Sequence, residues 1–177
     1  TYLSNFMNED GSVNWLPVCA DAHGFVVNKA LFEKYNIPLP TDYKSFVSAC
    51  QAFEKVGIRG FAADYFYDYT CMETLQGLSA SELSSTDGRK WRTAYSDPAS
   101  TEKVGLDNVV WPAAFDRMEQ FIKDTKLEPD DINLDYDMVD NLYQNGELAM
   151  YFGSSFGVKK YKDQGIDTVF LPFFEQN

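Results

Sequence analysis

The sequence Gly24-Phe25-Val26-Val27-Asn28-Lys29-Ala30-Leu31-Phe32 joins a compact apolar run directly to a helical pattern. The run Gly24–Asn28 is typical of a buried strand. A helix is expected from Lys29 to about Tyr35, because Pro38 and Pro40 then prevent it from continuing. Since strands that alternate with helices build α/β proteins, this stretch predicts the fold class.

The same alternation continues through the rest of the chain. Further strands are expected at residues 15–18, 60–63, 148–152 and 168–171, and further helices at 42–56, from about 64 to 78, at 101–125, in the stretch that ends near 146 and at 157–163. Thr41 and Asp42 are expected to cap the helix over 42–56. Its inner face repeats apolar side chains at helical spacing, namely Phe46, Cys50, Phe53 and Val56. Residues 79–100 are polar and predict an excursion or a small hairpin, and Pro112 marks a kink or a restart within 101–125.

The composition excludes several classes of function. The 177 residues suit one domain or one lobe of a larger protein, and 27 acidic against 15 basic residues give a net charge of -12. An acidic surface repels phosphate backbones and anionic lipid heads, so neither nucleic acid nor a membrane surface is an expected partner. No apolar run approaches the ~20 residues of a membrane span. Residues 1–14 are polar and contain Asp10-Gly11, which predicts a lead-in or hairpin before a single lobe over 15–177.

Neither a metal nor another cofactor is expected. The three cysteines, Cys19, Cys50 and Cys71, lie far apart and accompany a single histidine, His23, so a zinc site of cysteines and histidines is excluded. The cysteines are interpreted as buried small apolar residues. The acidic run over 130–140 lacks the glycine and glutamate positions of a calcium-binding loop, which favours a solvated loop and helix start.

Two sequence patterns are compatible with catalysis, but neither is sufficient to predict an enzyme. Gly153-Ser154-Ser155-Phe156-Gly157 matches the GxSxG pattern of a serine nucleophile, but no histidine follows it to act as the base. Asp64 and Asp68 are spaced to share a helix face, as paired carboxylates for glycoside hydrolysis would be. Because the tyrosines between them suit binding equally well, the chain is predicted not to be an enzyme.

Aromatic residues supply 16% of the chain. Most are expected to lie in the core. Flat aromatic faces also pack on the C–H groups of polyhydroxylated ligands, while neighbouring carboxylates and amides bind the hydroxyls. The composition therefore favours such ligands without identifying one.

Taken in order, several segments resemble the extracellular, periplasmic-type solute-binding proteins of ABC importers, in the branch that binds sugars and oligosaccharides. The segments are Trp15-Leu16-Pro17-Val18, Gly24 to Phe32, Ile37-Pro38-Leu39-Pro40-Thr41, Tyr143 to Met150 with Phe152-Gly153-Ser154, and Phe170-Leu171-Pro172-Phe173. The resemblance implies one lobe, the second, of a type II periplasmic-binding-protein-like fold, helix-rich with a small mixed sheet. Hinge-crossing segments are then expected near 15–20 and 168–174. It also implies a membrane permease as partner and an extracellular or periplasmic location for an exported parent, with or without a lipid anchor.

The resemblance also suggests which residues contact the ligand. Asp21 occupies the place, just after the first hinge strand, of an acid that binds sugar hydroxyls in this family. The segment after the strand at Gly60 presents an acid and an aromatic residue to the cleft, and here it contains Asp64, Tyr65, Tyr67 and Asp68. The turn at Gly153 often carries a tryptophan that stacks on a sugar ring. Here Ser154, Ser155 and Phe156 stand there instead, which leaves the sugar specificity open.

Two alternatives remain beside a carbohydrate-binding lobe. One is a fragment of a carbohydrate-active hydrolase that uses Asp64 and Asp68. The other is an acidic protein-interaction domain whose aromatic residues all lie in the core.

Overall fold

The computed structural model describes residues 7, 8, 10–13, 16, 18–102, 104–107 and 110–174, which contain a four-stranded mixed sheet. The strands are β1 (His23–Asn28), β2 (Arg59–Ala62), β3 (Leu148–Ser154) and β4 (Thr168–Leu171), in the order β2-β3-β1-β4. β1 is antiparallel to both β3 and β4, whereas β2 and β3 are parallel. The predicted fold class, a helix-rich α/β lobe with a small mixed sheet, is confirmed.

Helices connect the strands and cover the sheet. They are α1 (Lys29–Lys34), α2 (Tyr43–Lys55), α3 (Asp68–Leu78), α4 (Ala80–Ser84), α5 (Thr86–Ser96), α6 (Trp111–Thr125), α7 (Tyr136–Gln144) and α8 (Ser155–Asp163), with a short 3-10 helix, η2, at Pro129–Asn133. Asp42 caps α2 by accepting a hydrogen bond from the Ser45 amide, as predicted. No helix within the described residues is both long enough and apolar enough to cross a membrane.

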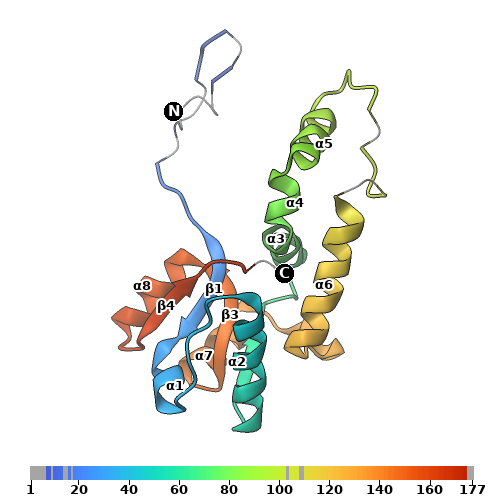
Figure 1. The fold of residues 1–177 in the computed structure, drawn as a ribbon. Coiled ribbons are helices and arrows are strands. Elements are labelled where there is room, and N and C mark those ends of the chain that lie inside the picture. Colours follow the sequence, from blue (N-terminus) through green and yellow to red (C-terminus); the bar gives the residue numbers. More distant parts are fainter. Residues whose placement is uncertain are drawn as a thin grey trace.

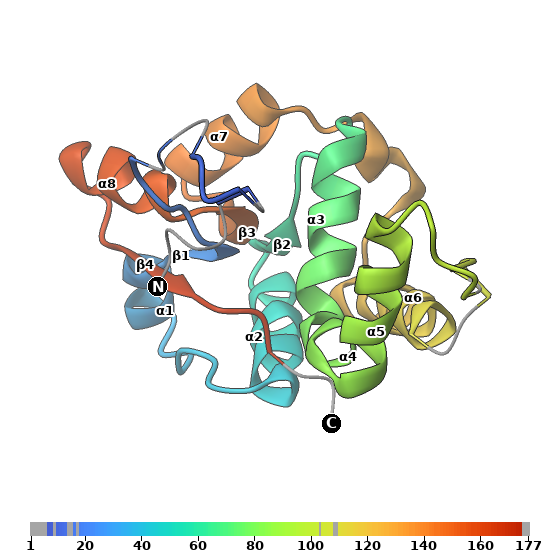
Figure 2. The same cartoon turned by 90° about the horizontal axis from the view of Figure 1, so that it is seen from above.

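The two faces of the sheet have separate cores because successive side chains on a strand point to opposite faces. One face carries Phe25, Val27, Phe61 and Met150 and packs against apolar side chains of α1, α2 and α6. The other face carries Val26, Ala62 and Tyr151 and packs against α7 and α8. Figure 2 shows the same three layers from above, with α7 and α8 on one side of the sheet and α1 and α2 on the other.

Two helices, α4 and α5, occupy residues 80–96 and no hairpin forms there, so of the two predicted alternatives the hairpin is wrong. Ser85 caps α5 through a hydrogen bond from the Gly88 amide, so Asp87-Gly88 begins a helix and does not form a turn. The fold needs glycine at position 88, because a Cβ there would lie 2.1 Å from the Glu82 carbonyl oxygen. The Trp91 ring of α5 then packs edge-on against Trp111 of α6. Figure 1 shows α3, α4, α5 and α6 grouped beside the sheet, with α5 extending away from it.

Helix α6 begins at Trp111, with Pro112 in its first turn. The helix predicted over 101–125 therefore starts later than expected, since the described residues 101, 102 and 104–107 are not helical. At the other end of the chain, Asp10 and Gly11 form a turn, and Met7 pairs with Val13 across it. Leu16 and Val18 are not in a strand, while Trp15 and Pro17 lie outside the described residues. The division of the chain at residue 15 therefore remains a prediction.

A buried hydroxyl pair joins α7 to the sheet and allows a first test. The Tyr143 hydroxyl lies 3.0 Å from Thr168 Oγ1, and both residues are fully buried. We expect Tyr143→Phe to lower the free energy of unfolding by about 1 kcal/mol, the usual net value of one hydrogen bond. Urea unfolding measures this change, and Tyr95→Phe at an exposed position provides the control. An unchanged denaturation midpoint would show that the pair contributes nothing.

Candidate functional site

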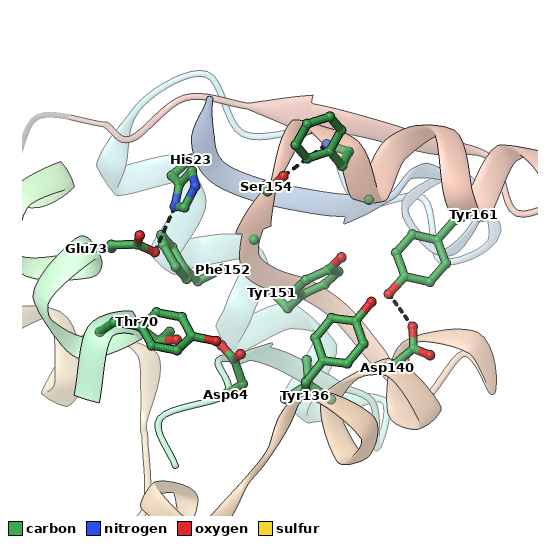
Figure 3. Close-up of a pocket in the computed structure, with 15 residues that line it drawn as sticks. His23, Asp64, Thr70, Glu73, Tyr136, Asp140, Tyr151, Phe152, Ser154 and Tyr161 are labelled. Carbon is green, nitrogen blue, oxygen red and sulfur yellow. Dashed lines mark hydrogen bonds and ion pairs between the residues drawn. The ribbon is translucent and has the colours of Figure 1, made fainter. Parts of the chain in front are cut away.

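A cavity of about 270 Å³ opens at one edge of the sheet. Its walls come from the start of β1, the loop after β2, the end of β3 and the helices α3, α7 and α8. The lining residues are His23, Asp64, Tyr69, Thr70, Glu73, Tyr136, Val139, Asp140, Tyr151, Phe152, Gly153, Ser154, Phe156, Gly157 and Tyr161. Figure 3 shows these side chains around the cavity.

The topology explains why the cavity lies at this edge. The parallel strands β2 and β3 both end here, and α3 and α8 follow them in the chain. In α/β sheets, ligands bind outside the carboxyl ends of such strands, where the loops and helix starts converge. β1 runs in the opposite direction, so its first residue, His23, arrives at the same edge opposite Ser154.

Aromatic side chains line much of the cavity and differ in exposure. Tyr69 is 55% exposed, Tyr136 48% and Phe156 64%. Tyr151, in contrast, is 7% exposed and fixed between Tyr143 and Tyr161. The cavity thus combines a rigid aromatic floor with exposed rings that are available to a ligand.

The Asp64 carboxyl lies beside Thr70 and has no ion-pair partner among the described residues. Burial raises the pKa of Asp64 above its usual value, and the nearby carboxylates Glu73 and Asp135 act in the same direction. The Thr70 hydroxyl has a smaller, opposing effect on the pKa. Thr70 is 1% exposed, and its Oγ1 has no hydrogen-bond partner of good geometry within the described part of the chain.

His23 connects two walls of the cavity. Its Nδ1 lies 2.8 Å from a Glu73 oxygen on α3, and its Nε2 lies 3.6 Å from an Asp21 oxygen. Asp21 in turn accepts hydrogen bonds from the Ser155 hydroxyl and the Ala22 amide. Burial acts to raise the pKa of Asp21, but the neighbouring serine hydroxyls, the Ala22 amide and the His23 ring outweigh it, so the pKa is lowered.

On the opposite wall, Asp140 is the acceptor of a local network. Its Oδ1 accepts hydrogen bonds of 2.6 Å from the Lys160 ammonium and from the Tyr161 hydroxyl, and its Oδ2 accepts one from Gln144. Burial acts to raise the pKa of Asp140, but these donors outweigh it and hold the pKa below its usual value. The network joins α7 to α8. It positions the ring of Tyr161, which donates to Asp140, and the ring of Tyr136, whose hydroxyl accepts from Lys160.

The structure brings only some of the predicted site residues to the cavity. Asp64, Ser154 and Phe156 line it, and Ser154 also caps α8 through the Phe156 amide. Asp21 and Ser155 are not among the lining residues. Asp21 contacts His23 and accepts a hydrogen bond from the Ser155 hydroxyl.

The remaining predicted residues lie elsewhere. Tyr65 is 8% exposed and packs in the core, with its hydroxyl near Thr74. Tyr67 stacks on Tyr69 but does not line the cavity, and Asp68 is exposed in the first turn of α3. Whether any of these residues binds a ligand stays a prediction.

Sequence reasoning missed the residues that α3 and α7 contribute, namely Tyr69, Thr70, Glu73, Tyr136 and Asp140. A signal was present for α3. Asp64 precedes the helix, and Tyr69 and Glu73 share one of its faces at a spacing of four residues. The α7 residues carried no such signal, because their acidic run is also typical of a solvated surface.

The described residues contain no group of histidines, cysteines and carboxylates that could hold a metal ion. Cys50 is buried in the core, as predicted, and Cys71 is half-buried. Cys19 is exposed, so its interpretation as a buried residue is wrong. The reason is that Cys19 belongs to the segment before β1, outside the packed layers.

The fold is that of an α/β lobe with a cavity at the strand ends. The chain matches the family of bacterial extracellular solute-binding proteins over residues 3–177 and therefore belongs to it, which confirms the predicted family. No curated protein sequence matches the chain.

Solved structures share the fold at low identity. A probable secreted solute-binding lipoprotein from Streptomyces coelicolor aligns with a TM-score of 0.74 at 15% identity, covering 98% of this chain and 42% of that one. A chitin oligosaccharide binding protein gives 0.70 at 18% identity, with 98% and 42% coverage. The solute-binding protein RafE in complex with raffinose gives 0.67 at 17% identity, with 98% and 47% coverage. The chain thus spans less than half the length of these structures.

Proposed function

We propose that the protein is the substrate-binding component of an ABC importer and that it binds a sugar or oligosaccharide in a cleft between this lobe and a second one. The observation that carries the proposal is the cavity in which three exposed aromatic rings, Tyr69, Tyr136 and Phe156, stand beside three carboxylates. Aromatic faces pack on the C–H surface of a sugar ring, and carboxylates accept hydrogen bonds from its hydroxyls. The sugar and oligosaccharide ligands of the similar structures support this proposal.

The site favours binding over catalysis. Asp64 lines the cavity but Asp68 does not, so the structure gives no support to a hydrolase that uses this pair. Ser155 of the GxSxG pattern donates its hydroxyl hydrogen to Asp21, and no imidazole is positioned as its base in the described residues. The aromatic residues at the cavity also weaken the alternative of an interaction domain whose aromatics all lie in the core.

The length of the site suits more than one sugar ring. His23 and Glu73, which line the cavity, also line a second hollow of about 600 Å³ formed with Gln76, Pro172 and Phe173. The first cavity alone is just smaller than the ~300 Å³ at which typical ligand pockets begin. A ligand that extends past His23 would therefore occupy both hollows.

The partners and location follow from the same proposal. An importer needs a membrane permease to receive the solute, and the parent protein acts outside the cytoplasmic membrane, with or without a lipid anchor. Since ligand contacts both lobes in the closed form, this lobe alone is expected to retain little of the affinity.

A thermal-shift screen of the full-length protein against mono- and oligosaccharides at millimolar concentration tests the proposal. Ligand at 100 times its dissociation constant adds about 2.7 kcal/mol to stability, so the bound sugar class raises the melting temperature in a dose-dependent way. If no saccharide shifts the melting temperature, the proposal fails, and other classes of solute are then to be screened as ligands.

Phe156 allows a more specific test. We expect Phe156→Ala to weaken saccharide binding about tenfold, because one aromatic stacking contact contributes roughly 0.5–1.5 kcal/mol beyond its buried area. Stability should change little, since the ring is 64% exposed. Isothermal titration calorimetry of the full-length variant measures the affinity, and Phe66→Ala, at an exposed position outside the cavity, is the control. Equal affinity in Phe156→Ala and the wild type would remove this residue from the site.

A further inference from the structure

Apart from His23, which is paired with Glu73, the titratable side chains of the cavity that carry charge are carboxylates. Asp64, Glu73 and Asp140 line it, and no lysine or arginine does so within the described residues. Lys160 on α8 is held by Asp140, with the two atoms 2.6 Å apart, and is not among the lining residues. A ligand that enters this cavity therefore meets acceptors without a free cation.

Two of the three carboxylates already have partners. Glu73 is paired with His23, and Asp140 accepts from Lys160, Tyr161 and Gln144. Asp64 has no ion-pair partner in the described structure, and the side-chain donor that faces its carboxylate is the Thr70 hydroxyl. The hydroxyl beside it, Thr70 Oγ1, is buried and lacks a partner of good geometry.

The buried Thr70 hydroxyl without a hydrogen-bond partner of good geometry is a second observation, independent of the acidic charge. Buried polar groups are almost always hydrogen-bonded, and an unsatisfied one lowers stability. Asp64 and Thr70 both line the cavity (Figure 3), and the Thr70 hydroxyl interacts with the Asp64 carboxylate. A ligand that donates a hydrogen bond to the carboxylate and also exchanges one with the hydroxyl would satisfy both groups at once.

Helix N-termini could in principle attract an anion to this edge, since α3, α7 and α8 all start here. Each start is already occupied by acceptors of the chain itself. Asp68 lies in the first turn of α3, the Asp135 carboxylate accepts from the Met138 amide of α7, and the Ser154 hydroxyl accepts from the Phe156 amide of α8. The helix starts therefore offer little to an anionic ligand.

We propose that the cavity selects uncharged or amino sugars and rejects acidic ones, and that Asp64 with Thr70 determines this specificity. The proposal rests on the sugar-binding function proposed above and adds the charge class of the solute. An ammonium or hydroxyl group of the sugar donates to Asp64 and contacts Thr70. A uronic or sialic acid carboxylate would face Asp64, Glu73 and Asp140 without a cation to balance it.

Two physical effects strengthen the discrimination. Burial and the nearby Glu73 and Asp135 carboxylates already raise the pKa of Asp64. A ligand that brings a further negative charge to this position would therefore bind unfavourably. A ligand ammonium group would instead stabilise the ionised carboxylate. The chain also carries a net charge of -12, which lowers the local concentration of anions at moderate salt.

Three trisaccharides of the same β-1,4-linked, gluco-configured backbone provide the test. They are the glucose trimer, the glucosamine trimer, in which an ammonium group replaces the C2 hydroxyl of each ring, and the glucuronic acid trimer, in which a carboxylate replaces the C6 hydroxymethyl group. Titration of each into the 15N-labelled chain near neutral pH, followed by nuclear magnetic resonance, detects weak binding and places it on individual residues. We expect the amide signals of Asp64, Thr70 and Glu73 to move with the neutral and amino trimers at concentrations at least tenfold below those needed for the acidic trimer.

Matched variants separate Asp64 from the general acidity of the surface. Asp64→Asn should reduce the difference between amino and acidic trimers severalfold, because the variant has lost the unpaired charge but keeps a side chain of similar size. Asp137→Asn removes the same charge from an exposed position on α7, outside the cavity, and should leave the difference unchanged. A smaller difference in both variants alike would assign the selectivity to net charge and overturn the role of Asp64.

The outcomes also distinguish this inference from the proposed function. If the acidic trimer moves the cavity signals as strongly as the neutral one, the charge selectivity is wrong while saccharide binding stands. If no trimer moves any cavity signal, and the saccharide screen of the full-length protein is also negative, both proposals fail together.

Discussion

Phe46→Ala is expected to lower the free energy of unfolding by about 3–5 kcal/mol, the usual cost of removing a fully buried phenylalanine side chain. Phe46 is 0% exposed and stacks on Phe25 with the ring centroids 4.6 Å apart. It also contacts the rings of Phe61 on β2 and Phe121 on α6, at 5.8 and 5.9 Å. The truncation therefore leaves a cavity where two helices meet the sheet.

Urea or thermal unfolding followed by circular dichroism measures this effect. For a chain of this length each kcal/mol corresponds to roughly 2–4 °C in melting temperature, so a decrease of roughly 6–20 °C is expected. Phe115→Ala on α6, at a side chain that is 46% exposed, is the matched control and should change stability by less than about 0.5–1 kcal/mol. Equal losses in the two variants would contradict the aromatic core described here.

The sequence predicted the parts of the fold that depend on local pattern. Gly24–Asn28 forms most of β1, and Lys29 begins the helix that follows it directly. Phe46, Cys50 and Phe53 all lie in the core, as their helical spacing indicated, although Val56 is 46% exposed just beyond the end of α2. These elements were predictable because the hydrophobic period and the capping residue agree with the tertiary packing.

The prediction for the polar stretch at residues 79–100 was wrong for the opposite reason. Its helices α4 and α5 bury little apolar surface of their own, so no hydrophobic period marks them. They are held by contacts that a single sequence does not show, such as the ring contact between Trp91 and Trp111 and the ion pair of Arg117 with Glu82. Asp87-Gly88 then predicted a turn where a capped helix starts.

The site was predictable by segment but not by side chain. The resemblance placed ligand contacts after β2 and at the end of β3. These two segments meet at the cavity, while ligand binding by their residues stays a prediction. Within the first segment, however, the start of α3 determines which residues face inward. Tyr65 precedes the helix and turns into the core, while Tyr69 and Glu73 face the cavity. A shift of a few residues in a helix start rotates the whole face, which is why composition alone could not identify these side chains.

Asp140→Asn provides the second large effect, and its pH dependence is the informative part. The Asp140 side chain is 15% exposed and accepts from three donors on α7 and α8. The neutral amide cannot pair with Lys160, and it leaves donors without an ionised acceptor. We expect a loss of about 2 kcal/mol in the free energy of unfolding at neutral pH, within the ~1–3 kcal/mol of a lost charge-assisted hydrogen bond. Asp137→Asn, exposed on the same helix, should cost less than about 1 kcal/mol.

The sign of the pH dependence follows from the direction of the pKa shift. In the folded protein the pKa of Asp140 lies below the ordinary value of 3.8, which the unfolded chain retains. Its ionised form therefore contributes stability that is fully present well above pH 3.8 and is lost as the pH falls from there through the folded pKa. The wild type and Asp140→Asn should differ most near neutral pH and converge in acid, because protonation removes the charge that the variant already lacks. Unfolding curves measured across this range test the argument: a difference that stays constant in acid would mean that Asp140 stabilises the two helices by packing and not by its charge.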